Sequence, residues 1–386
     1  MRIAHWTDIY PLPKEMHSGH AIQKLVRSLR GLPGQAEHKV YHFLLLGIGI
    51  LKYVSPRYRA KAEAIKSGPY EGGLYYQRIF QLPKNLFSTQ MNPIWQKYFL
   101  PKLAGQIQCD LIHVHTCYNL AYGAVLAGKR YGIPIVVTIR REQEIPGLPS
   151  RRVRILMEAM KLADAVISPS AHLAEKCRRA TGANVHIIPS GTETIFDENP
   201  PTDLPRKQQV LFAGALDKNK GIEVLLEASL ELFASGFCFE LCIIGDGPLR
   251  KKWQAIGQRY PNIRFLGSVK PDVVRDQMRC SKVFCLPSYT ETLGLVFIEA
   301  MKQGVAVIGR KGTGIDGMGV AGEDYEVIEN DAQLPAMLRA LLSDDARRLK
   351  LAAAGQRLAK DWTWENSALK HMAVYERLIH KKKCPI

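Results

Sequence analysis

Two carboxylates stand on either side of a glycine turn in the segment Leu286–Gly309. Glu291 precedes the turn, Glu299 follows it, and Gly294 lies between them. The run VFCLPS predicts a buried strand, LVFIEAMKQG a helix and VAVIG the next strand. In such a unit the ligand lies beyond the carboxyl ends of the strands, where free amides at the helix start favour anions. Because ionised carboxylates only accept hydrogen bonds, we expect this pair to bind hydroxyl groups such as those of a sugar and a ribose. The plain alternative is a capped helix with one surface glutamate.

A second segment, Phe212–Ala228, carries the complementary charge. Its letters are FAGALDKNKGIEVLLEA, which predict a strand ending at Gly214, a polar loop with Lys218 and Lys220, and a helix after Gly221. Such a loop can place ammonium groups beside a diphosphate. The alternative is a helix with a solvated basic entry loop.

Together these segments resemble the donor site of retaining glycosyltransferases with the GT-B fold, in particular family 4. That family has Glu, seven residues and Glu before an Ala-Met-x-x-Gly helix end, here Glu291, Glu299, Ala300, Met301 and Gly304. The resemblance covers nearly the whole chain. It implies an α/β fold of two Rossmann-like, doubly wound parallel-sheet domains that face a central cleft. It also implies transfer of a sugar, with retention of anomeric configuration, from a nucleotide diphosphate sugar to an acceptor hydroxyl.

The resemblance also implies a role for individual residues. Glu291 would orient the donor sugar and Glu299 the ribose, while Lys220 and Lys218 would balance charge on the leaving phosphate. Ala215 stands where the family usually has arginine. The expected catalytic residues are His115, Lys220 and Glu291. The expected donor-binding residues are Gly19, Gly214, Lys218, Lys220, Gly245, Val269, Glu291, Thr292, Leu293, Gly294, Leu295 and Glu299.

The first half of the chain would supply the acceptor side. In DLIHVHT, strand alternation puts His113 and His115 on the same side, and His115 falls at the strand end, where the family often has a histidine close to the reacting sugar. A structural role for His115 is the alternative. Ser18 and Gly19 precede a helix that we expect to begin near His20, and the amide of Gly19 could contact the donor phosphate or the acceptor.

Two arginines follow the strand VVTI. Arg140 stands where the family commonly has histidine, and Arg141 follows it. If they face the ligand, they favour an anionic acceptor or a phosphate. They could equally pair with Glu142 and Glu144, so both readings stay open.

The order of predicted elements divides the chain. Strands alternate with helices, which is typical of a parallel sheet covered on both faces. The polar, proline-bearing stretch 197–209 interrupts the alternation and is the expected linker. We therefore expect an acceptor-side domain over 1–196 and a nucleotide-sugar-binding domain over 210–365. A last helix within 366–386, with a basic tail, would cross back to the first domain.

Charge and apolar content bear on partners and location. The 386 residues carry a net charge of +17, and residues 1–200 hold 26 Lys and Arg against 14 Asp and Glu. This suits a saccharide or lipid-linked saccharide acceptor, or contact with an anionic membrane, through the basic segment 52–66; a solvated loop is the alternative for that segment. No nucleic-acid recognition module is present in the sequence, so we expect no nucleic-acid partner.

The sequence also predicts where the protein works. The start MRIAHWTDIY lacks the apolar core of a signal peptide, and Tyr41–Leu51 is about half the ~20 apolar residues that a membrane span needs. Cys238, Cys242, Cys280 and Cys285 lie in or beside apolar runs, which favours buried reduced thiols. We expect a cytoplasmic protein, with contact at the inner face of the cell membrane as a further reading.

Three other expectations complete the interpretation. No Asp-x-Asp stands in a suitable place, so we expect a metal-independent enzyme with no cofactor besides its donor substrate. Synthesis of a cell-surface polysaccharide, lipopolysaccharide or glycolipid is the expected setting. The alternatives are a sugar-nucleotide epimerase or phosphorylase with the same donor pocket, and a non-catalytic carbohydrate-binding scaffold.

Overall fold

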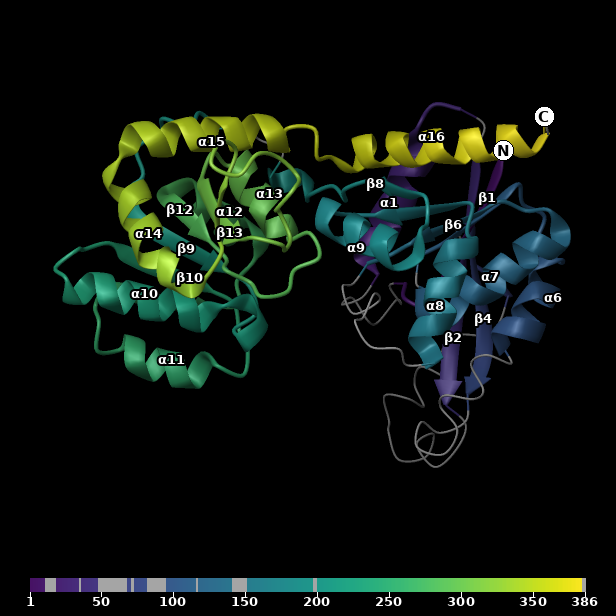
Figure 1. Ribbon diagram of the computed structural model, residues 1–386, viewed down its shortest axis with the longest axis horizontal. Coiled ribbons are helices and arrows are strands. Elements are labelled where there is room, and N and C mark those ends of the chain that lie inside the picture. The colour runs from purple at the N-terminus through teal and green to yellow at the C-terminus, as the bar shows by residue number, and fades with distance from the viewer. Residues whose placement is uncertain are drawn as a thin grey trace. The chain divides into compact units, whose positions relative to one another are not determined.

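The protein forms two compact units (Figure 1). The computed structural model describes residues 1–10, 19–34, 36–47, 68–70, 73–81, 95–115, 117–140, 151–196 and 200–383. Unit 1 comprises Met1–Pro169, Leu173–Ile188 and Ser367–Ile386, and unit 2 comprises Ser170–His172 and Pro189–Asn366. The division therefore falls at Ile188, ahead of the expected linker, and strand β9 already begins at Lys207.

Unit 1 is built on an eight-stranded sheet in the order β3-β4-β2-β1-β5-β6-β7-β8. Every described pairing is parallel except that of β3 with β4. Its elements are β1 (Arg2–Thr7), α1 (His20–Gly31), β2 (Glu37–Gly47), β3 (Gly68–Tyr70), β4 (Leu74–Gln81), the π-helix η2 (Trp95–Phe99), α6 (Leu100–Ala104), β5 (Leu111–Val114), α7 (Cys117–Tyr131), β6 (Ile135–Thr138), α8 (Arg151–Leu162), β7 (Ala165–Ser168), α9 (Ala171–Thr181), β8 (Val185–Ile187) and α16 (Trp364–Lys383).

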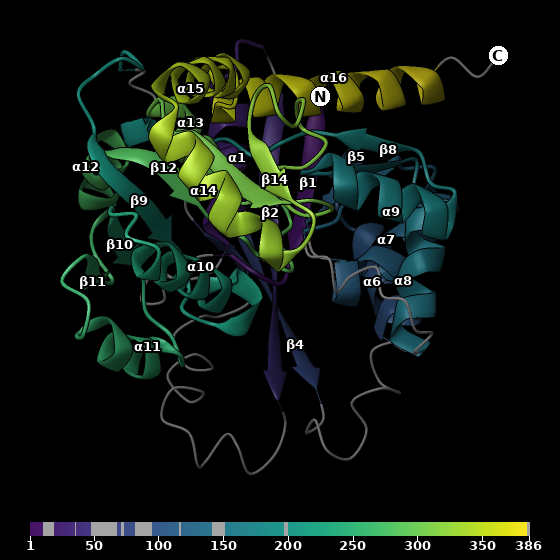
Figure 2. The same cartoon turned by 60° about the vertical axis from the view of Figure 1, so that its left-hand side comes forward.

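The central strands of unit 1 read as short apolar runs because both faces are covered. All four residues of β5, of β6 and of β7 are buried, as expected for parallel strands with helices on each side. Strands β2 and β4 run side by side in register (Figure 2). Most of helix α16 belongs to this unit, and its Tyr375 hydroxyl lies 2.6 Å from Nδ1 of His113 on β5.

Unit 2 is built on a six-stranded parallel sheet in the order β11-β10-β9-β12-β13-β14. Its elements are the 3-10 helix η4 (Thr194–Phe196), β9 (Lys207–Ala213), the 3-10 helix η5 (Lys218–Lys220), α10 (Ile222–Ala234), β10 (Glu240–Ile244), α11 (Arg250–Gly257), β11 (Ile263–Gly267), α12 (Pro271–Cys280), β12 (Ser281–Cys285), α13 (Leu295–Lys302), β13 (Ala306–Arg310), β14 (Glu326–Ile328), the 3-10 helix η6 (Asp331–Gln333), α14 (Leu334–Ser343) and α15 (Asp345–Ala359).

Helices cover both faces of the second sheet. Helices α10 and α14 pack together on one face, and α13 and α15 pack together on the other (Figures 1 and 2). Between them one continuous apolar core runs through all the central strands. The predicted fold class, two doubly wound parallel-sheet domains, is confirmed.

Some sequence expectations meet the structure differently. The predicted strand in Tyr41–Leu51 is present as the second half of β2, and residues 48–51 lie outside the described part. Cys238 is exposed, because it follows the end of α10 in a surface loop, so the prediction of burial is wrong there, whereas Cys242 and Cys285 are buried. Among the described residues, no helix has the length and apolar character to cross a membrane. The basic segment 52–66 lies outside the described residues.

Candidate functional site

The order of the second sheet reverses at β9, which lies between β10 and β12. In open parallel sheets, ligands bind beyond the carboxyl ends of the two strands that flank such a reversal. The loop after β9 carries Lys220, and the loop after β12 carries Glu291. These two side chains form an ion pair, with 26% and 14% of their side-chain surfaces exposed. The structure therefore brings together two of the predicted site residues, from loops about 70 residues apart in sequence.

The lysine loop is held against the end of β12 by backbone contacts. The carboxylate of Asp217 accepts a hydrogen bond from the amide of Lys220 at 3.0 Å, which closes η5. The amide of Tyr289 donates to the carbonyl of Asn219 at 2.8 Å. Gly221 follows with a φ of 69°, and a Cβ there would lie 2.3 Å from the carbonyl oxygen of Pro287. Only glycine permits this approach, which fixes Lys220 beside Glu291.

The glutamate turn is braced by a loop that the sequence did not single out. Gly294 caps α13, and its carbonyl accepts from the amide of Phe297 at 2.9 Å. The amide of Gly314, in the loop after β13, donates to the carbonyl of Glu291 at 2.9 Å. The available signal was a pair of glycines, Gly312 and Gly314, directly after a predicted strand.

Gly214 and Gly245 lie where neighbouring strands of unit 2 end. We expected Gly245 to let the backbone approach a nucleotide. Its φ is 132°, and a Cβ there would lie 1.8 Å from the carbonyl oxygen of Gly214. The amide of Gly214 donates to the carbonyl of Ile244 at 3.0 Å. The amide of Gly245 donates to the carbonyl of Gly267 at 2.9 Å. These glycines therefore bind the ends of β9, β10 and β11 to one another.

The remaining predicted donor-side residues of unit 2 differ in how deeply they are buried. Lys218 is exposed on η5, Leu293 is buried, and Val269 is half-buried against the core of unit 2. The half-buried residues near the start of α13 are Thr292, Gly294, Leu295 and Glu299.

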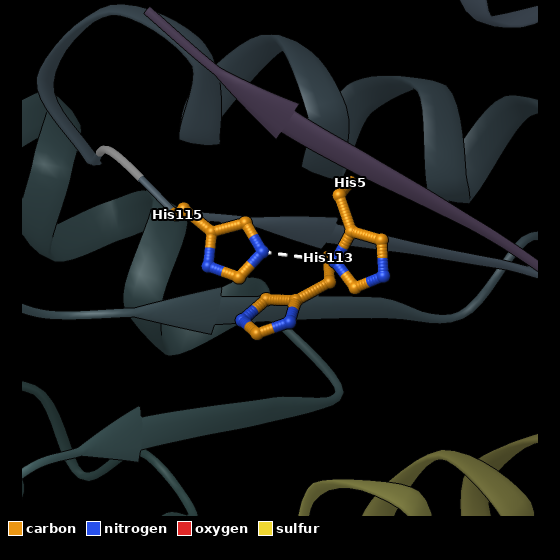
Figure 3. Close-up of side chains that lie close together, drawn as sticks. All are labelled: His5, His113 and His115. Atoms are coloured by element: carbon orange, nitrogen blue, oxygen red, sulfur yellow. Dashed lines mark hydrogen bonds between the residues drawn. The ribbon is translucent and has the colours of Figure 1, made fainter. Parts of the chain in front are cut away.

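Unit 1 has its own reversal of strand order, at β1 between β2 and β5. Four imidazoles gather there from three strands. Nδ1 of His5 on β1 lies 2.9 Å from Nε2 of His115, just after β5, and Nε2 of His5 lies 3.0 Å from Nδ1 of His38 on β2. The ring centroids of His113 and His115 are 3.9 Å apart, which places both on the same side of the strand as predicted (Figure 3).

Burial keeps these imidazoles uncharged. His5, His113 and His115 have no exposed surface, and His38 is 3% exposed. Burial, followed by repulsion from neighbouring imidazoles and arginines, holds the pKa values of His5, His113 and His115 well below the usual 6.5. Burial, followed by repulsion from Arg30 and from the N-terminal ammonium, lowers the pKa of His38 to about 4.

Arg140 closes one end of the cluster. Its Nε donates to the carbonyl of His115 at 3.2 Å, and its guanidinium NH2 group lies 3.2 Å from Nδ1 of the same residue. His113 is held separately, with its two nitrogens 2.6 Å from the hydroxyls of Tyr375 and Thr138. Both nitrogens of His115 are therefore engaged inside the protein, and its side chain reaches no surface.

The other acceptor-side residues are partly described. Gly19 directly precedes α1, and its carbonyl accepts from the amide of Ile22 at 3.0 Å. Arg140 is half-buried just beyond β6. Ser18 and Arg141 lie outside the described residues.

Comparison with known proteins places this architecture. A relative, the D-inositol 3-phosphate glycosyltransferase of Xylanimonas cellulosilytica, is 26% identical over 311 residues, which cover 71% of this chain and 73% of the relative. The phosphatidyl-myo-inositol mannosyltransferase of Mycolicibacterium smegmatis is 31% identical over 208 residues, 51% of this chain and 53% of that protein. The solved structure of Anabaena Alr3699/HepE in complex with UDP matches with a TM-score of 0.69 at 16% identity, covering 98% of this chain and 100% of the other.

Two family profiles match consecutive parts of the chain. Glycosyltransferase Family 4 matches residues 52–195, and Glycosyl transferases group 1 matches residues 207–344. Together they span well over half of the 386 residues, and each falls mainly on one of the two units. The chain is therefore a member of the GT-B glycosyltransferases of the family 4 type.

Proposed function

We propose that the protein transfers a sugar from a nucleotide diphosphate sugar to an acceptor hydroxyl, with retention of anomeric configuration. The observation that carries the proposal is the ion pair of Lys220 and Glu291 at the strand reversal of unit 2, directly before the start of α13. Retention rests on the resemblance of these segments to retaining enzymes. The Anabaena structure with UDP, of the same fold, supports a nucleotide donor.

The charges of this region suit a sugar attached to a diphosphate. Lys220, with the exposed Lys218 on the same short helix, supplies positive charge, and the start of α13 adds amide donors. A carboxylate has about four acceptor sites, so Glu291 can hold Lys220 and accept a sugar hydroxyl together. Glu299, about one turn into α13, would accept from the ribose.

The reaction would proceed by departure of the nucleoside diphosphate. The bond between the anomeric carbon and the phosphate oxygen breaks, and its electron pair stays on the phosphate. The acceptor oxygen bonds to the same face of that carbon, and its proton passes to a phosphate oxygen. Lys220 would stabilise the charge that grows on the leaving group, a kind of contribution typically worth about 3–4 kcal/mol. Because lysines and helix amides would stabilise the negative charge on the leaving diphosphate, we propose that the enzyme needs no metal.

The acceptor would be an anionic or lipid-linked saccharide or polyol. The names of two relatives include inositol phosphate and phosphatidyl-inositol, and unit 1 places Arg140 just beyond β6. Transfer to such a compound would suit the synthesis of a glycolipid or cell-surface polysaccharide, at the cytoplasmic face of the membrane. His115, which is fully buried, would act there as a positioning residue.

A transfer assay tests this proposal. The purified protein is incubated with UDP-, GDP- and ADP-sugars in turn, with inositol phosphate, phosphatidyl-inositol or inositol as acceptor, and with EDTA in a parallel set. We expect release of nucleoside diphosphate with one donor, an α-anomeric product from an α-linked donor, and no loss with EDTA. Inversion, loss with EDTA, or transfer to inorganic phosphate would contradict the respective part of the proposal.

A further inference from the structure

Three buried histidines of unit 1 form a continuous chain of hydrogen bonds that ends at an arginine. The sequence of contacts runs from Arg140 to His115, then to His5 and then to His38, with separations of 3.2, 2.9 and 3.0 Å. Each link between two histidines joins one ring nitrogen to another (Figure 3 shows the link between His5 and His115). The chain crosses the strand reversal of unit 1, since its histidines come from β2, β1 and the end of β5.

The arginine sets the direction of the whole chain. A guanidinium only donates hydrogen bonds, so Nδ1 of His115 must accept from Arg140. A neutral imidazole has one donor and one acceptor nitrogen. The proton of His115 is therefore on Nε2, where it donates to Nδ1 of His5. By the same reasoning Nε2 of His5 donates to Nδ1 of His38, and the proton of His38 is on Nε2.

The far end of the chain fits this assignment. Nε2 of His38 is buried and has no hydrogen-bond partner in the structure. A buried donor without an acceptor costs about 1–3 kcal/mol. Turning the chain round would satisfy no more groups, because Nδ1–H of His115 would then face the N–H groups of Arg140. Nε2 of His38 lacks a partner in either direction, so the donor groups of Arg140 alone select the direction of the chain.

A metal ion is the rival occupant of this cluster. Nitrogens of His5, His113 and His115 all lie within 4.8 Å of one another, which is close enough for three ligands to one ion. A metal held by Nδ1 of His5 and Nε2 of His115 would need lone pairs on both. The proton of His115 would then move to Nδ1 and oppose the donor of Arg140. The contact with Arg140 and a bound cation are thus incompatible at His115.

We propose that His115, His5 and His38 are a relay of neutral imidazoles, all protonated on Nε2, that holds the guanidinium of Arg140 in place to bind the anionic group of the acceptor. This assignment of a role to Arg140 rests on the proposed function. The relay itself does not, because it follows from donor and acceptor chemistry within unit 1. His5 and His38 are positioning residues, because both side chains are buried and cannot contact a ligand.

The relay is tested by nitrogen NMR of protein labelled with ¹⁵N-histidine at pH 7.5. We expect His5, His38 and His115 each to show a protonated Nε2 and an unprotonated Nδ1. In Arg140→Met, which removes the donor, we expect a population of His115 with the proton on Nδ1. Protonated Nδ1 in wild-type His115, an unchanged spectrum in Arg140→Met, or stoichiometric zinc in the purified protein would overturn the relay.

The link to the acceptor is tested by kinetics of the full-length protein. His5→Phe keeps the ring volume and removes both hydrogen bonds. We expect it to raise the KM for inositol phosphate about tenfold and to leave the KM for uncharged inositol and for the donor unchanged. His371→Phe is the matched control. His371 is buried on α16 with its ring centroid 5.7 Å from that of His113, and among the described residues its hydrogen bond goes to the carbonyl of Ser367, at 2.7 Å, and not to the relay. Equal KM changes for the two acceptors, or equal effects of the two variants, would refute the role of the relay.

The two experiments fail separately. If the protein transfers no sugar at all, the proposed function fails, while the NMR result still decides whether the relay exists. If transfer occurs but His5→Phe acts only on kcat, the relay does not position an anion-binding group.

Discussion

The two units place different chemistry at the same topological position. In unit 2 the strand reversal carries a lysine and a glutamate that are partly open to solvent and paired with each other. In unit 1 it carries imidazoles that burial keeps neutral, with Arg140 beside His115 at one edge. If both proposals hold, the two units prepare a binding group in different ways. Unit 2 exposes charge directly on short loops, and unit 1 buries a polar network that orients the guanidinium of Arg140.

The largest expected effect comes from removing the charge in unit 2. Lys220→Met should lower the rate of sugar transfer by about 10²–10³-fold, because the growing charge on the leaving phosphate loses its nearest cation. The thermal unfolding temperature should change little, since the side chain is partly exposed. Initial rates and a melting curve of the same preparation check both statements.

Lys252→Met is the matched control for that variant. Lys252 pairs with Glu223 at 2.7 Å on the surface of the same unit. Its removal should leave the rate unchanged. A comparable loss of rate in both variants would show that the net positive charge of the unit, and not the position of Lys220, determines the rate of transfer.

The next effect concerns the backbone that supports the donor loops. Gly245→Ala should destabilise the protein by about 3–5 kcal/mol, because a Cβ would lie 1.8 Å from the carbonyl oxygen of Gly214 at a φ of 132°. Gly236→Ala, with a φ of 79° and open space around the added Cβ, should cost about 1 kcal/mol. Urea unfolding of the two variants measures the difference. Equal losses of stability in the two variants would mean that the positive φ alone, and not the close approach to Gly214, makes glycine necessary at position 245.

The histidines should make the stability of the protein depend on pH. The pKa values of His38 and His371 are lowered to about 4 by burial, whereas an unfolded histidine titrates near 6.5. Between these values the unfolded chain binds protons that the folded chain does not. The contribution of these histidines to the free energy of unfolding should therefore be fully present above pH 6.5. Below pH 6.5 the free energy of unfolding should fall, by up to ~1.4 kcal/mol per pH unit for each such histidine.

Unfolding in urea at pH 7.5, 6.0 and 5.0 checks this dependence. His371→Phe should reduce the slope, because it removes one histidine whose pKa burial lowers. Of the 11 histidines in the sequence, only His172 lies in unit 2, so the effect belongs to unit 1. A flat profile between pH 6.5 and 5.0 would contradict the assignment of neutral, buried imidazoles.

The smallest expected effect is on the affinity for a nucleoside diphosphate, and it concerns Ala215 in the donor region. Ala215 is exposed in the loop after β9, at the position where the sequence resemblance led us to expect arginine. Ala215→Arg should tighten binding of a nucleoside diphosphate about tenfold, close to the ~1.5 kcal/mol at the lower end for a charge-assisted hydrogen bond. Calorimetric titration of the variant measures this gain. An unchanged affinity would place residue 215 away from the diphosphate.

What the sequence could predict differed between the two regions. The strand, turn and helix around Glu291 follow from local signals, because the apolar run, Gly294 and Gly304 lie within one short segment. The relay in unit 1 does not, because His5, His38 and His115 meet only through the order and register of β2, β1 and β5. The brace from Gly314 was missed for the same reason, since it joins the loops of two separate strands.

The central claim is that the loops after β9 and β12 form the donor site of this glycosyltransferase. Titration calorimetry of UDP and GDP with wild type, Lys220→Met and Lys252→Met tests it most directly. The account predicts that one nucleotide binds to wild type and Lys252→Met alike, and at least tenfold more weakly to Lys220→Met. Equal binding to all three proteins would contradict it, since the diphosphate would then lie elsewhere in the molecule.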